Sequence, residues 1–281
     1  MILRREGIKM VRSLWTAATG MIAQQTNVDT IANNLANVNT VGYKAETAEF
    51  KSLLYQTMQT KTTTANGANK PIGAQVGLGV RNSAITSIFK QGSMLASESD
   101  TAFGISGSGF FGIKGQDGET YYTRNGNFIF TTATDGGFML ATTDGLPVLD
   151  TEGKPITISN KYVASKIQVT SDGALTYPDE KNNLQPMGIS IGLYQFPNPS
   201  GLIKLDSTLY AVSDVSGVAI NEATNNNIQK SEVIQGYLEG SSVQVADEMV
   251  NLIVAQRAYE MNSKAITTTD EMLQQANQLK R

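Results

Sequence analysis

The last forty-one residues of this chain, 241–281, contain neither glycine nor proline, and this absence constrains the fold more than any other feature. Such a run predicts one uninterrupted helix of roughly 60 Å, because an α-helix rises ~1.5 Å per residue. Ser241 or Ser242 is the predicted N-cap, since a serine oxygen accepts hydrogen bonds from the first amides of a helix. Apolar side chains recur at intervals of seven and predict one stripe along the helix: Val245, Leu252, Tyr259, Ile266 and Leu273.

A second long helix is predicted near the N-terminus, from Val11 to about Thr40, with Gly42 as its C-terminal stop. Its apolar side chains form two columns, of which Gln24 interrupts the second: Leu14, Met21, Val28 and Leu35, then Ala17, Ile31 and Val38. Five asparagines lower the intrinsic stability of this helix, because asparagine is a poor helix former. We therefore expect the helix to persist only when it is packed.

Residues 1–9 lack the apolar core and the small-residue cleavage site of a secretory signal. Arg4-Arg5-Glu6-Gly7 is what a purine-rich ribosome-binding site would encode if it were translated, and Met10 follows at a suitable distance. We hypothesise that the native protein starts at Met10 and that residues 1–9 are an extension. N-terminal sequencing of natively expressed protein tests this hypothesis.

Composition excludes several classes of function. The chain of 281 residues is long enough for about two domains of roughly 150 residues. Its 22 basic and 25 acidic residues give a net charge of −3, which argues against a nucleic-acid or anionic-membrane partner. Histidine and cysteine are absent, so thiol nucleophiles, histidine bases and the commonest transition-metal ligands are excluded. No apolar run approaches the ~20 residues of a membrane span, so no membrane insertion is predicted.

All seven prolines lie between the two predicted helices, where the hydrophobic period also changes. Tyr55–Pro71, rich in Thr, Ala, Asn and Gly, predicts an extended linker or loop. Phe110–Lys114 and Glu119–Thr123 then flank Asp117-Gly118, a signal for a two-residue hairpin turn. Further β-prone runs follow between glycine turns, at 127–131, 166–170, 174–177 and 189–196. The fold class is therefore α+β, with long terminal helices in a coiled-coil-like pair and a central antiparallel all-β domain.

The apparent catalytic and cofactor motifs of the sequence have structural explanations. Gly107–Gly112 matches G-x-G-x-x-G, but a hairpin arm follows where a dinucleotide site needs a helix. We interpret these glycines as turn residues, with Phe110 and Phe111 packing on opposite sides of a strand. Two carboxylate pairs have structural explanations: Glu46 and Glu49 as a solvated helix face, and Asp247 and Glu248 as dipole partners in a first helical turn. Trp15 and Tyr259 are interpreted as interhelical packing residues, and no catalytic, cofactor or metal site is predicted.

Energetics argue that the terminal helices need more than each other. Each offers about six to eight apolar side chains, worth up to roughly 1.5–3 kcal/mol apiece on full burial, while ordering costs about 1–2 kcal/mol per residue. Pairing the two helices gives one continuous line of apolar contacts and one interrupted line, because Gln24, Glu248 and Asn262 break the second columns. Head-to-tail contacts between identical subunits supply the missing neighbours and produce a filament. We expect the termini to be largely disordered in the monomer and to order on assembly.

Three motifs carry a resemblance to a known family. Residues 33–44 are similar to the N-terminal signature of the bacterial flagellar rod and hook proteins, and residues 255–265 resemble their C-terminal one. Between them, residues 107–128 are similar to the central β motif of that family. The positions that carry the two terminal signatures are Asn34, Leu35, Ala36, Asn37, Gly42 and Tyr43, and Gln256, Arg257, Ala258 and Tyr259. The resemblance covers residues 10–281, and its length and opening segment 12–21 look most like the distal rod members of the family.

The resemblance implies a structural subunit of the distal rod. Such proteins are exported unfolded through the flagellar type III channel without a cleaved signal. They polymerise beneath a cap into a tube, with paired terminal helices inside and β domains outside. The implied partners are further copies of the chain, other rod proteins, the hook protein, the rod cap, the surrounding ring proteins and the export apparatus. The tube is a rigid drive shaft in the periplasm that transmits motor torque to the hook and conducts exported subunits.

The resemblance and the pattern together predict these domains: an extension at 1–9, an N-terminal core helix at 10–45, a linker and rod-type insertion at 46–80, a β region at 81–235 and a C-terminal core helix at 236–281. The insertion, roughly Tyr55–Val76, is implied to stiffen the rod by touching neighbouring subunits. The assembly interface is predicted at Leu14, Met21, Val28, Ile31, Leu35, Val38, Val245, Leu252, Tyr259, Ile266 and Leu273.

Other functions stay open at this point. Within the family, a proximal rod protein or a hook protein is the nearest alternative. A β-domain enzyme acting on cell-wall glycan would need a cleft with paired carboxylates. A soluble binding module that trimerises through its termini would form a closed oligomer of fixed size instead of an open polymer.

Overall fold

The computed structural model describes residues 2–59, 74–133, 136–179, 183–206, 208–225 and 228–279. The chain divides into two compact units. Unit 1 comprises Met1–Leu35, Glu46–Thr86 and Gln244–Arg281, and unit 2 comprises Ala36–Ala45 and Ser87–Val243. Each unit therefore combines segments that are far apart in the sequence.

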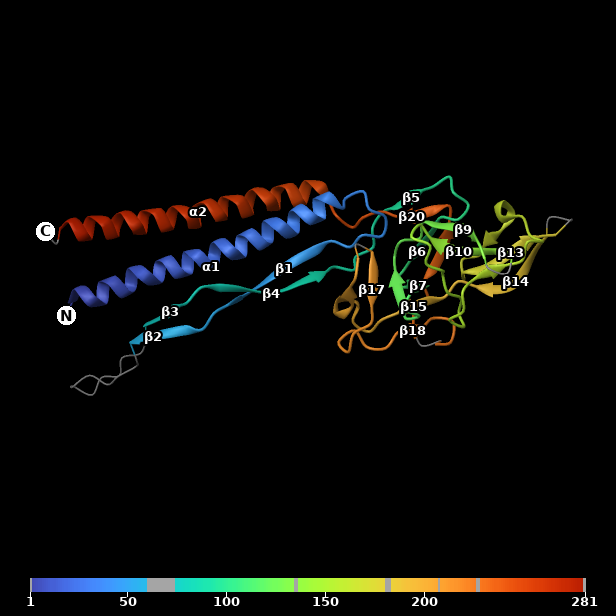
Figure 1. The fold of residues 1–281 in the computed structure, drawn as a ribbon, viewed down its shortest axis with the longest axis horizontal. Coiled ribbons are helices and arrows are strands. Elements are labelled where there is room, and N and C mark those ends of the chain that lie inside the picture. The colour runs from blue at the N-terminus through green and yellow to red at the C-terminus, as the bar shows by residue number, and fades with distance from the viewer. Residues whose placement is uncertain are drawn as a thin grey trace. The chain divides into compact units, whose positions relative to one another are not determined.

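Unit 1 contains two long helices, α1 (Ile2–Ala36) and α2 (Val245–Gln278), which lie side by side and antiparallel (Figure 1). The sequence predicts α1 to end near Thr40, but it ends at Ala36. A turn follows, in which the Thr40 amide donates to the Asn37 carbonyl and the Thr40 hydroxyl to the Asn37 side chain, both at 3.1 Å. Asparagine side chains bond the nearby chain in this way and so compete with helix formation.

The helix starts also differ from the prediction. Helix α1 begins at Ile2 instead of Val11, so the described residues of the extension, 2–9, are helical. Helix α2 begins at Val245 after Gln244, which makes no side-chain cap. The predicted serine cap is wrong, because the Ser242 hydroxyl accepts from the Ala45 amide and the Ser241 hydroxyl from the Val243 amide. Asp247 and Glu248 do lie in the first turn of α2, as predicted.

The rest of unit 1 is a two-stranded β ribbon. Strand β1 (Glu46–Ser52) pairs with β4 (Val80–Ser87), and β2 (Tyr55–Gln59) pairs antiparallel with β3 (Ala74–Gly77). The predicted loop at Tyr55–Pro71 is therefore wrong over β2, and its remainder lies outside the described residues. The helix predicted for Glu46 and Glu49 is also wrong, since both lie in β1, where Glu49 accepts from the Thr86 hydroxyl of β4 at 3.3 Å.

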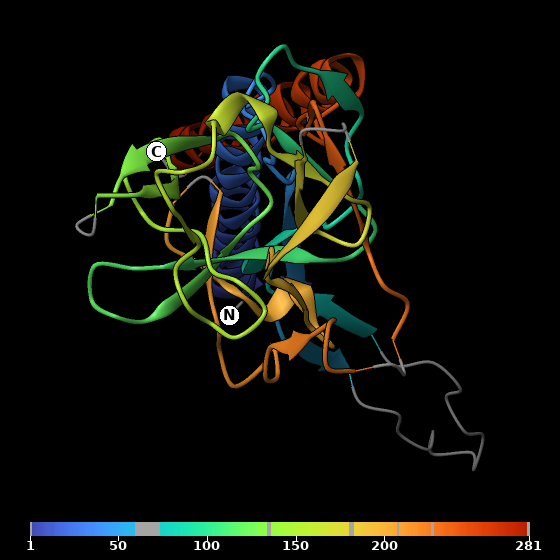
Figure 2. The same cartoon turned by 90° about the vertical axis from the view of Figure 1, so that its right-hand side faces the viewer.

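Unit 2 consists of short strands, and every strand pairing that fixes its register is antiparallel. Figure 2 shows these strands in several small sheets. The largest sheet has the order β16-β17-β8-β7-β15-β18: Ile203–Lys204, Leu209–Ala211, Thr120–Thr123, Phe110–Lys114, Leu193–Gln195 and Ile220–Asn221. Two three-stranded sheets are β11-β10-β9 (Thr157–Ile158, Phe138–Thr142, Phe128–Thr132) and β12-β13-β14 (Gln168–Val169, Ala174–Pro178, Leu184–Ser190). Two pairs complete the unit: β19 (Glu232–Gln235) with β6 (Phe103–Ser106), and β20 (Tyr237–Glu239) with β5 (Met94–Ala96).

The predicted hairpin is present as β7–β8, but its turn has three residues instead of two. The Gly115 amide donates to the Glu119 carbonyl at 2.8 Å and the Gly118 amide to the Gly115 carbonyl at 3.1 Å. Gly118 has a φ of +82°, the left-handed conformation that closes a three-residue loop of this kind. The predicted run at 189–196 is likewise divided, because β14 ends at Ser190 and β15 begins at Leu193.

The core of unit 2 forms on both sides of β7. Phe111 belongs to one cluster with Phe103, Phe128 and ten other buried apolar residues, while Phe110 packs with Tyr122, Phe196 and Tyr210 in another. The interpretation that these two phenylalanines face opposite sides of a strand is therefore confirmed. Gly112 lies inside β7 and opens no helix, so the glycine run has the geometry of a strand and not of a dinucleotide site.

Candidate functional site

Three contacts between α1 and α2 are made by small or polar residues. The hydroxyls of Ser13 and Thr269 lie 3.4 Å apart, a Cβ at Gly20 would lie 3.0 Å from Asn262 Nδ2, and Asn34 Nδ2 donates to Glu248 Oε1 at 3.3 Å. In all three pairs the two residue numbers add to 282, so the antiparallel register is constant. We call these six residues the polar seam.

Among the residues of the polar seam, Asn34 has a side chain with three hydrogen bonds, and it is almost fully buried. Its amide donates to the Glu46 carbonyl at 2.8 Å, and its carbonyl accepts from the Glu46 amide at 2.8 Å. With the bond to Glu248, a single side chain connects α1, the start of β1 and the first turn of α2. This asparagine of the N-terminal signature therefore positions the three elements of unit 1.

The predicted apolar stripes flank this seam. On α1, Ile31 is buried, and Leu14, Met21, Val28 and Leu35 are half-buried. On α2, Leu252, Ile266 and Leu273 are half-buried, while Val245 and Tyr259 are each 42% exposed. Val38 lies beyond α1 in unit 2 and is half-buried. The only buried residues of α2 among those described are Ala255 and Thr269.

Large apolar side chains remain exposed on both helices. The most exposed are Trp15 at 67%, Ile22 at 65%, Met261 at 66% and Val254 at 62%. The interpretation of Trp15 as a packing residue between α1 and α2 is therefore wrong for the single chain. We define the outer apolar surface as Trp15, Ile22, Met249, Val250, Ile253, Val254, Met261 and Met272, each about half exposed or more. Beside it, Gln25, Val28, Gln256, Tyr259 and Glu260 line a groove within unit 1.

The positions of the C-terminal signature are mostly exposed. Gln256 and Arg257 face solvent, Arg257 pairs with Glu260 at 2.9 Å, and Ala258 is half-buried. Ala36 is exposed and Asn37 half-buried, whereas Gly42 and Tyr43 are buried in unit 2. The N-terminal signature therefore contributes to both units, and the C-terminal signature contributes to unit 1 alone.

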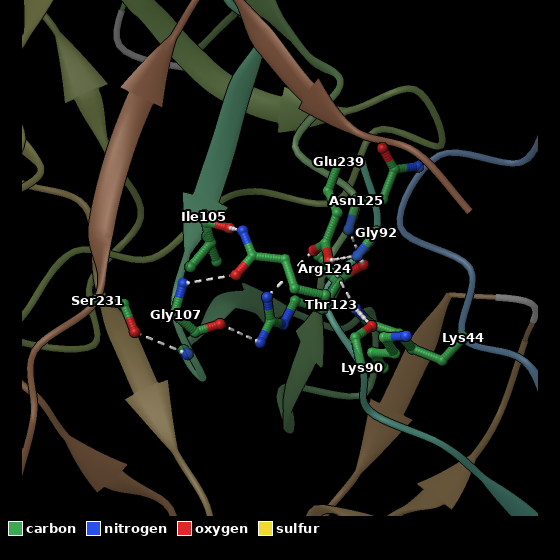
Figure 3. A network of polar contacts seen from close by, with 12 residues as sticks. Lys44, Lys90, Gly92, Ile105, Gly107, Thr123, Arg124, Asn125, Ser231 and Glu239 are labelled. Atoms are coloured by element: carbon green, nitrogen blue, oxygen red, sulfur yellow. Dashed lines mark hydrogen bonds and ion pairs between the residues drawn. The ribbon is translucent and has the colours of Figure 1, made fainter. Parts of the chain in front are cut away.

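Unit 2 contains a buried cluster of charges around Glu239, shown in Figure 3. Glu239 Oε1 accepts from Lys44 Nζ at 2.7 Å and from the Gly92 amide at 2.8 Å, and Oε2 accepts from Arg124 NH1 at 3.1 Å. The side chains of Lys44 and Glu239 are 0% exposed and that of Arg124 is 3% exposed. We call Lys44, Arg124 and Glu239 the charge clasp.

Two cations share one carboxylate in the clasp, each cation also donates to one backbone carbonyl, and the buried Arg124 Nε has no hydrogen-bond partner. Lys44 Nζ donates to the Lys90 carbonyl at 2.8 Å, and Arg124 NH2 donates to the Gly107 carbonyl at 2.7 Å. The Arg124 guanidinium also lies 5.1 Å from the centre of the Phe110 ring. Burial lowers the pKa of Lys44 below its usual 10.5, and the neighbouring Arg124 lowers it further, while Glu239 acts in the opposite direction.

The clasp was not predicted from the sequence, because its members are separated by 80 and 115 residues. The available signal was weak: each charged residue stands next to residues that are buried or in a strand, as in Tyr43-Lys44 and Leu238-Glu239. Gly42 completes the arrangement. Its amide donates to the Glu239 carbonyl at 2.8 Å, and a Cβ there would lie 2.6 Å from the Asn125 amide nitrogen. Only glycine therefore fits at this position.

A second buried polar cluster in unit 2 is fully bonded. Glu222 accepts from the Ser231 amide at 2.6 Å, from the Ser231 hydroxyl at 2.9 Å and from the Gln195 amide group at 2.9 Å. Ser231 in turn accepts from the Gly109 amide at 2.8 Å. Across the described ranges, no group of three acidic side chains is placed to hold a metal ion. Among the described residues, neither helix is long and apolar enough to cross a bilayer.

Comparison with known proteins gives a consistent result along the chain. Residues 14–44 match the family described as "Flagella basal body rod protein", residues 104–177 match "Flagellar hook protein FlgE/F/G D1 domain", and residues 234–279 match "Flagellar basal body rod FlgEFG protein C-terminal". Lys44, Arg124 and Glu239 each lie in a different one of these three segments. The chain is 42% identical to the flagellar basal-body rod protein FlgG of Borreliella burgdorferi, over 97% of this chain and 100% of the relative.

Other relatives extend this similarity. The chain is 41% identical to FlgG of Agrobacterium fabrum, over 93% of this chain and 97% of the relative. It is 31% identical to the flagellar hook-basal body complex protein FlhP of Bacillus subtilis, over 94% and 97% of the two chains. Identity above 30% over almost the full length of both proteins shows common ancestry. This chain belongs to the flagellar basal-body rod protein family.

Proposed function

We propose that the chain is a structural subunit of the distal rod, which polymerises with further copies of itself into a rigid tube. The observation that carries this proposal is the outer apolar surface, where side chains such as Val254 and Met261 are about two-thirds exposed in the single chain. Contiguous exposed apolar surface on a long helix indicates a protein–protein contact. Membership in a family of structural rod proteins makes a second copy the first candidate for that contact and excludes an enzyme.

The balance of energies supports this occupant. Full burial of a Val, Ile or Met side chain is worth about 1.5–3 kcal/mol, whereas a polar contact in the seam adds only about 0.5–1.5 kcal/mol. The seam therefore fixes register but supplies little of the stability that two long helices need. Neighbouring subunits supply the rest by covering the outer apolar surface and the half-buried stripes that contain Leu14, Val28, Leu252 and Ile266.

The geometry favours an open polymer over a closed oligomer. The outer apolar surface has one part on α1, around Trp15 and Ile22, and another on α2, around Val250 and Val254. These two parts differ in their side chains. Contact between unlike surfaces is heterologous and gives a filament when the rotation does not close. In this proposal the subunits are exported through the flagellar apparatus and form a tube in the periplasm. The tube contacts hook, cap and ring proteins, and it transmits torque to the hook.

A proximal rod or hook role is the second candidate, and the similarity to the hook-basal body complex protein of Bacillus subtilis supports it. Identity to that protein is 31%, against 42% and 41% for two proteins of the FlgG type. We therefore favour the distal rod. Locating the tagged chain by cryo-electron microscopy of purified basal bodies decides between these positions.

Polymerisation is tested with two matched double variants of the purified chain. Val250→Ser with Val254→Ser changes side chains that are 59% and 62% exposed on α2. Val215→Ser with Val218→Ser makes the same chemical change at sites 71% and 81% exposed in unit 2. We expect the α2 variant to lose polymers, by sedimentation and electron microscopy, while the control keeps them. Equal polymerisation by both variants contradicts the proposed interface.

The order of the free subunit is a separate part of the proposal. The contacts of the polar seam are weak, so they stabilise the two helices little in the free subunit. We therefore expect fast hydrogen exchange of the backbone amides of α1 and α2 in dilute monomer, and strong protection of the same amides in the polymer. Exchange in unit 2 is the internal control. Full protection of both helices in the monomer contradicts this expectation.

The ribbon supports the proposed stiffening role of Tyr55–Val76. Leu54 and Tyr55, where β1 passes into β2, are 83% and 62% exposed, and so are available to neighbouring subunits. Deletion of Tyr55–Pro71 is expected to leave tubes that bend more easily, measured from thermal fluctuations in electron micrographs. An unchanged bending modulus contradicts the role.

A further inference from the structure

The chain passes between the two compact units four times, after Leu35, Ala45, Thr86 and Val243. Three of the segments that lead to these crossings are bonded together inside unit 2: residues 42–45, 88–92 and 239–242. The Ile88 amide donates to the Ala45 carbonyl at 2.8 Å, and the Ser242 amide donates to the Tyr43 carbonyl at 3.1 Å. The three chain segments therefore leave unit 2 from one bonded group.

The charge clasp lies at the centre of this group. Glu239 belongs to one segment, Lys44 to the second, and the third supplies the Gly92 amide and the Lys90 carbonyl. The carboxylate and the ammonium thus bond all three segments within 2.8 Å. A backbone pair reinforces them, because the Gly42 amide donates to the Glu239 carbonyl at 2.8 Å.

Arg124 connects this group to the β body. It directly follows β8 of the six-stranded sheet, bonds the Gly107 carbonyl between β6 and β7, and lies over the Phe110 ring. One buried residue therefore contacts Glu239, a loop and the aromatic core at once. A charge-assisted bond in a water-free interior is stronger than the same bond in water, and it breaks only at high cost because a charge is left unpaired.

We propose that the charge clasp is the coupling through which force on the segments leading to β1, β4 and α2 reaches the β body. Each crossing is a single stretch of backbone. Bonded to Glu239, the three segments take up load together and deliver it to the sheet through Arg124. This inference rests on the proposed role as a torque-bearing subunit, which gives the coupling its purpose.

The absence of cysteine allows a direct mechanical test on the full-length chain. Cysteines at the exposed positions Ala246 and Asp144 provide one handle in the first turn of α2 and one on a turn of unit 2. Pulling between them in an optical trap loads residues 239–243 before the β body. Lys44→Met should lower the force of the first rupture by about one half or more. In this variant the Arg124–Glu239 pair is the one ion pair that remains in the clasp.

Two controls separate coupling from stability. Glu152→Gln removes an ion pair with Lys154 whose side chains are 69% and 72% exposed, and it should leave the first rupture force unchanged. Ile156→Val weakens the core of unit 2 away from the clasp, and denaturant is added until its stability equals that of Lys44→Met. An equal first rupture force in these two proteins overturns the proposal, because the clasp would then add stability only.

A second variant and a second readout guard against misfolding. Glu239→Gln keeps the side-chain shape but removes the charge, and it should speed amide exchange at Gly42, Gly92 and Ser242 together, by roughly 100-fold or more. Unchanged exchange at these amides also overturns the proposal. Both measurements use the single subunit, so a failure to polymerise would disprove the rod role without affecting the outcome for the clasp.

Discussion

The two compact units bury their apolar side chains to very different degrees. In unit 2, Phe111, Phe128, Ile105 and the other buried residues of their cluster are 0–5% exposed and form one continuous core. In unit 1, the 34 residues of α2 include only Ala255 and Thr269 as buried residues, while Val254 and Met261 stay exposed. Unit 2 therefore contains the packing that stabilises it, whereas unit 1 lacks part of its own. In the proposed function, unit 1 is the part of the subunit that assembly completes.

The largest expected effect separates the two units by one pair of truncations. Phe111→Ala should lower the free energy of unfolding of unit 2 by about 3–5 kcal/mol, because it opens a cavity in a fully packed core. Tyr259→Ala on α2, where the ring is 42% exposed, should lower the stability of the monomer by less than about 1 kcal/mol. Urea denaturation of both variants measures the contrast. If the two truncations cost the same in the monomer, unit 1 is as well packed as unit 2.

A glycine pair gives the next largest effect. Gly42 and Gly118 have similar left-handed φ values of +72° and +82°. A Cβ at Gly42 would lie 2.6 Å from the Asn125 nitrogen, whereas a Cβ at Gly118 meets nothing within 4 Å. Gly118→Ala should therefore cost only about 1 kcal/mol for the conformation, and Gly42→Ala roughly 2–4 kcal/mol because it also forces the backbone beside the clasp apart.

Thermal and urea denaturation of the two alanine variants measure this difference. The Gly42→Ala variant should also weaken the bond between the Gly42 amide and the Glu239 carbonyl, which hydrogen exchange at Gly42 reports. Equal stability of the two variants would mean that the chain beside Arg124 can move without cost.

The sequence predicted a helix from a long run without glycine or proline, and strands from the glycine turns between them. The absence of glycine and proline predicted α2, and glycine turns predicted β7, β8, β9 and β13 within one or two residues. The opposite orientations of Phe110 and Phe111 followed from the alternation of a strand. These signals are local, so they survive without knowledge of the tertiary structure.

The features that were missed depend on contacts between distant segments. A heptad rule selects columns of large apolar residues, but two helices approach closely where side chains are small, as at Gly20 and Asn262. The ribbon strands β1 to β4 were missed because most of their described side chains are exposed and give no clear alternation of burial. Lys44 and Glu239 gave only a weak signal, since a buried ion pair is defined by the fold.

A smaller effect tests whether the polar seam is a real contact. Gly20→Ala alone should give little net change, because a gain of about 1 kcal/mol in helix propensity is offset by a Cβ only 3.0 Å from Asn262. In an Asn262→Ala background the contact is gone, and the full gain should appear. The double-mutant cycle should therefore give a coupling energy of about 0.5–1 kcal/mol by chemical denaturation. A cycle with the exposed Gln256→Ala should instead be additive, and additivity at Asn262 would remove that residue from the seam.

The smallest effect concerns pH and Glu248, whose carboxylate faces Asn34 in the polar seam. Burial raises the pKa of Glu248 above its usual 4.5, the bond from Asn34 opposes this, and Asp247 adds to it. A raised pKa means that the folded state favours the protonated acid. The stabilising contribution is therefore complete below about pH 4.5 and is lost as the pH rises through the higher folded value. Glu248→Gln imitates the protonated form, so the variant should be more stable than the wild type at pH 7 and equal to it at about pH 4. The free energy of unfolding is measured against pH for both proteins, and subtracting one curve from the other cancels the other titrating groups. A difference that stays constant across this range would show that Glu248 is as well solvated in the folded chain as in the unfolded one.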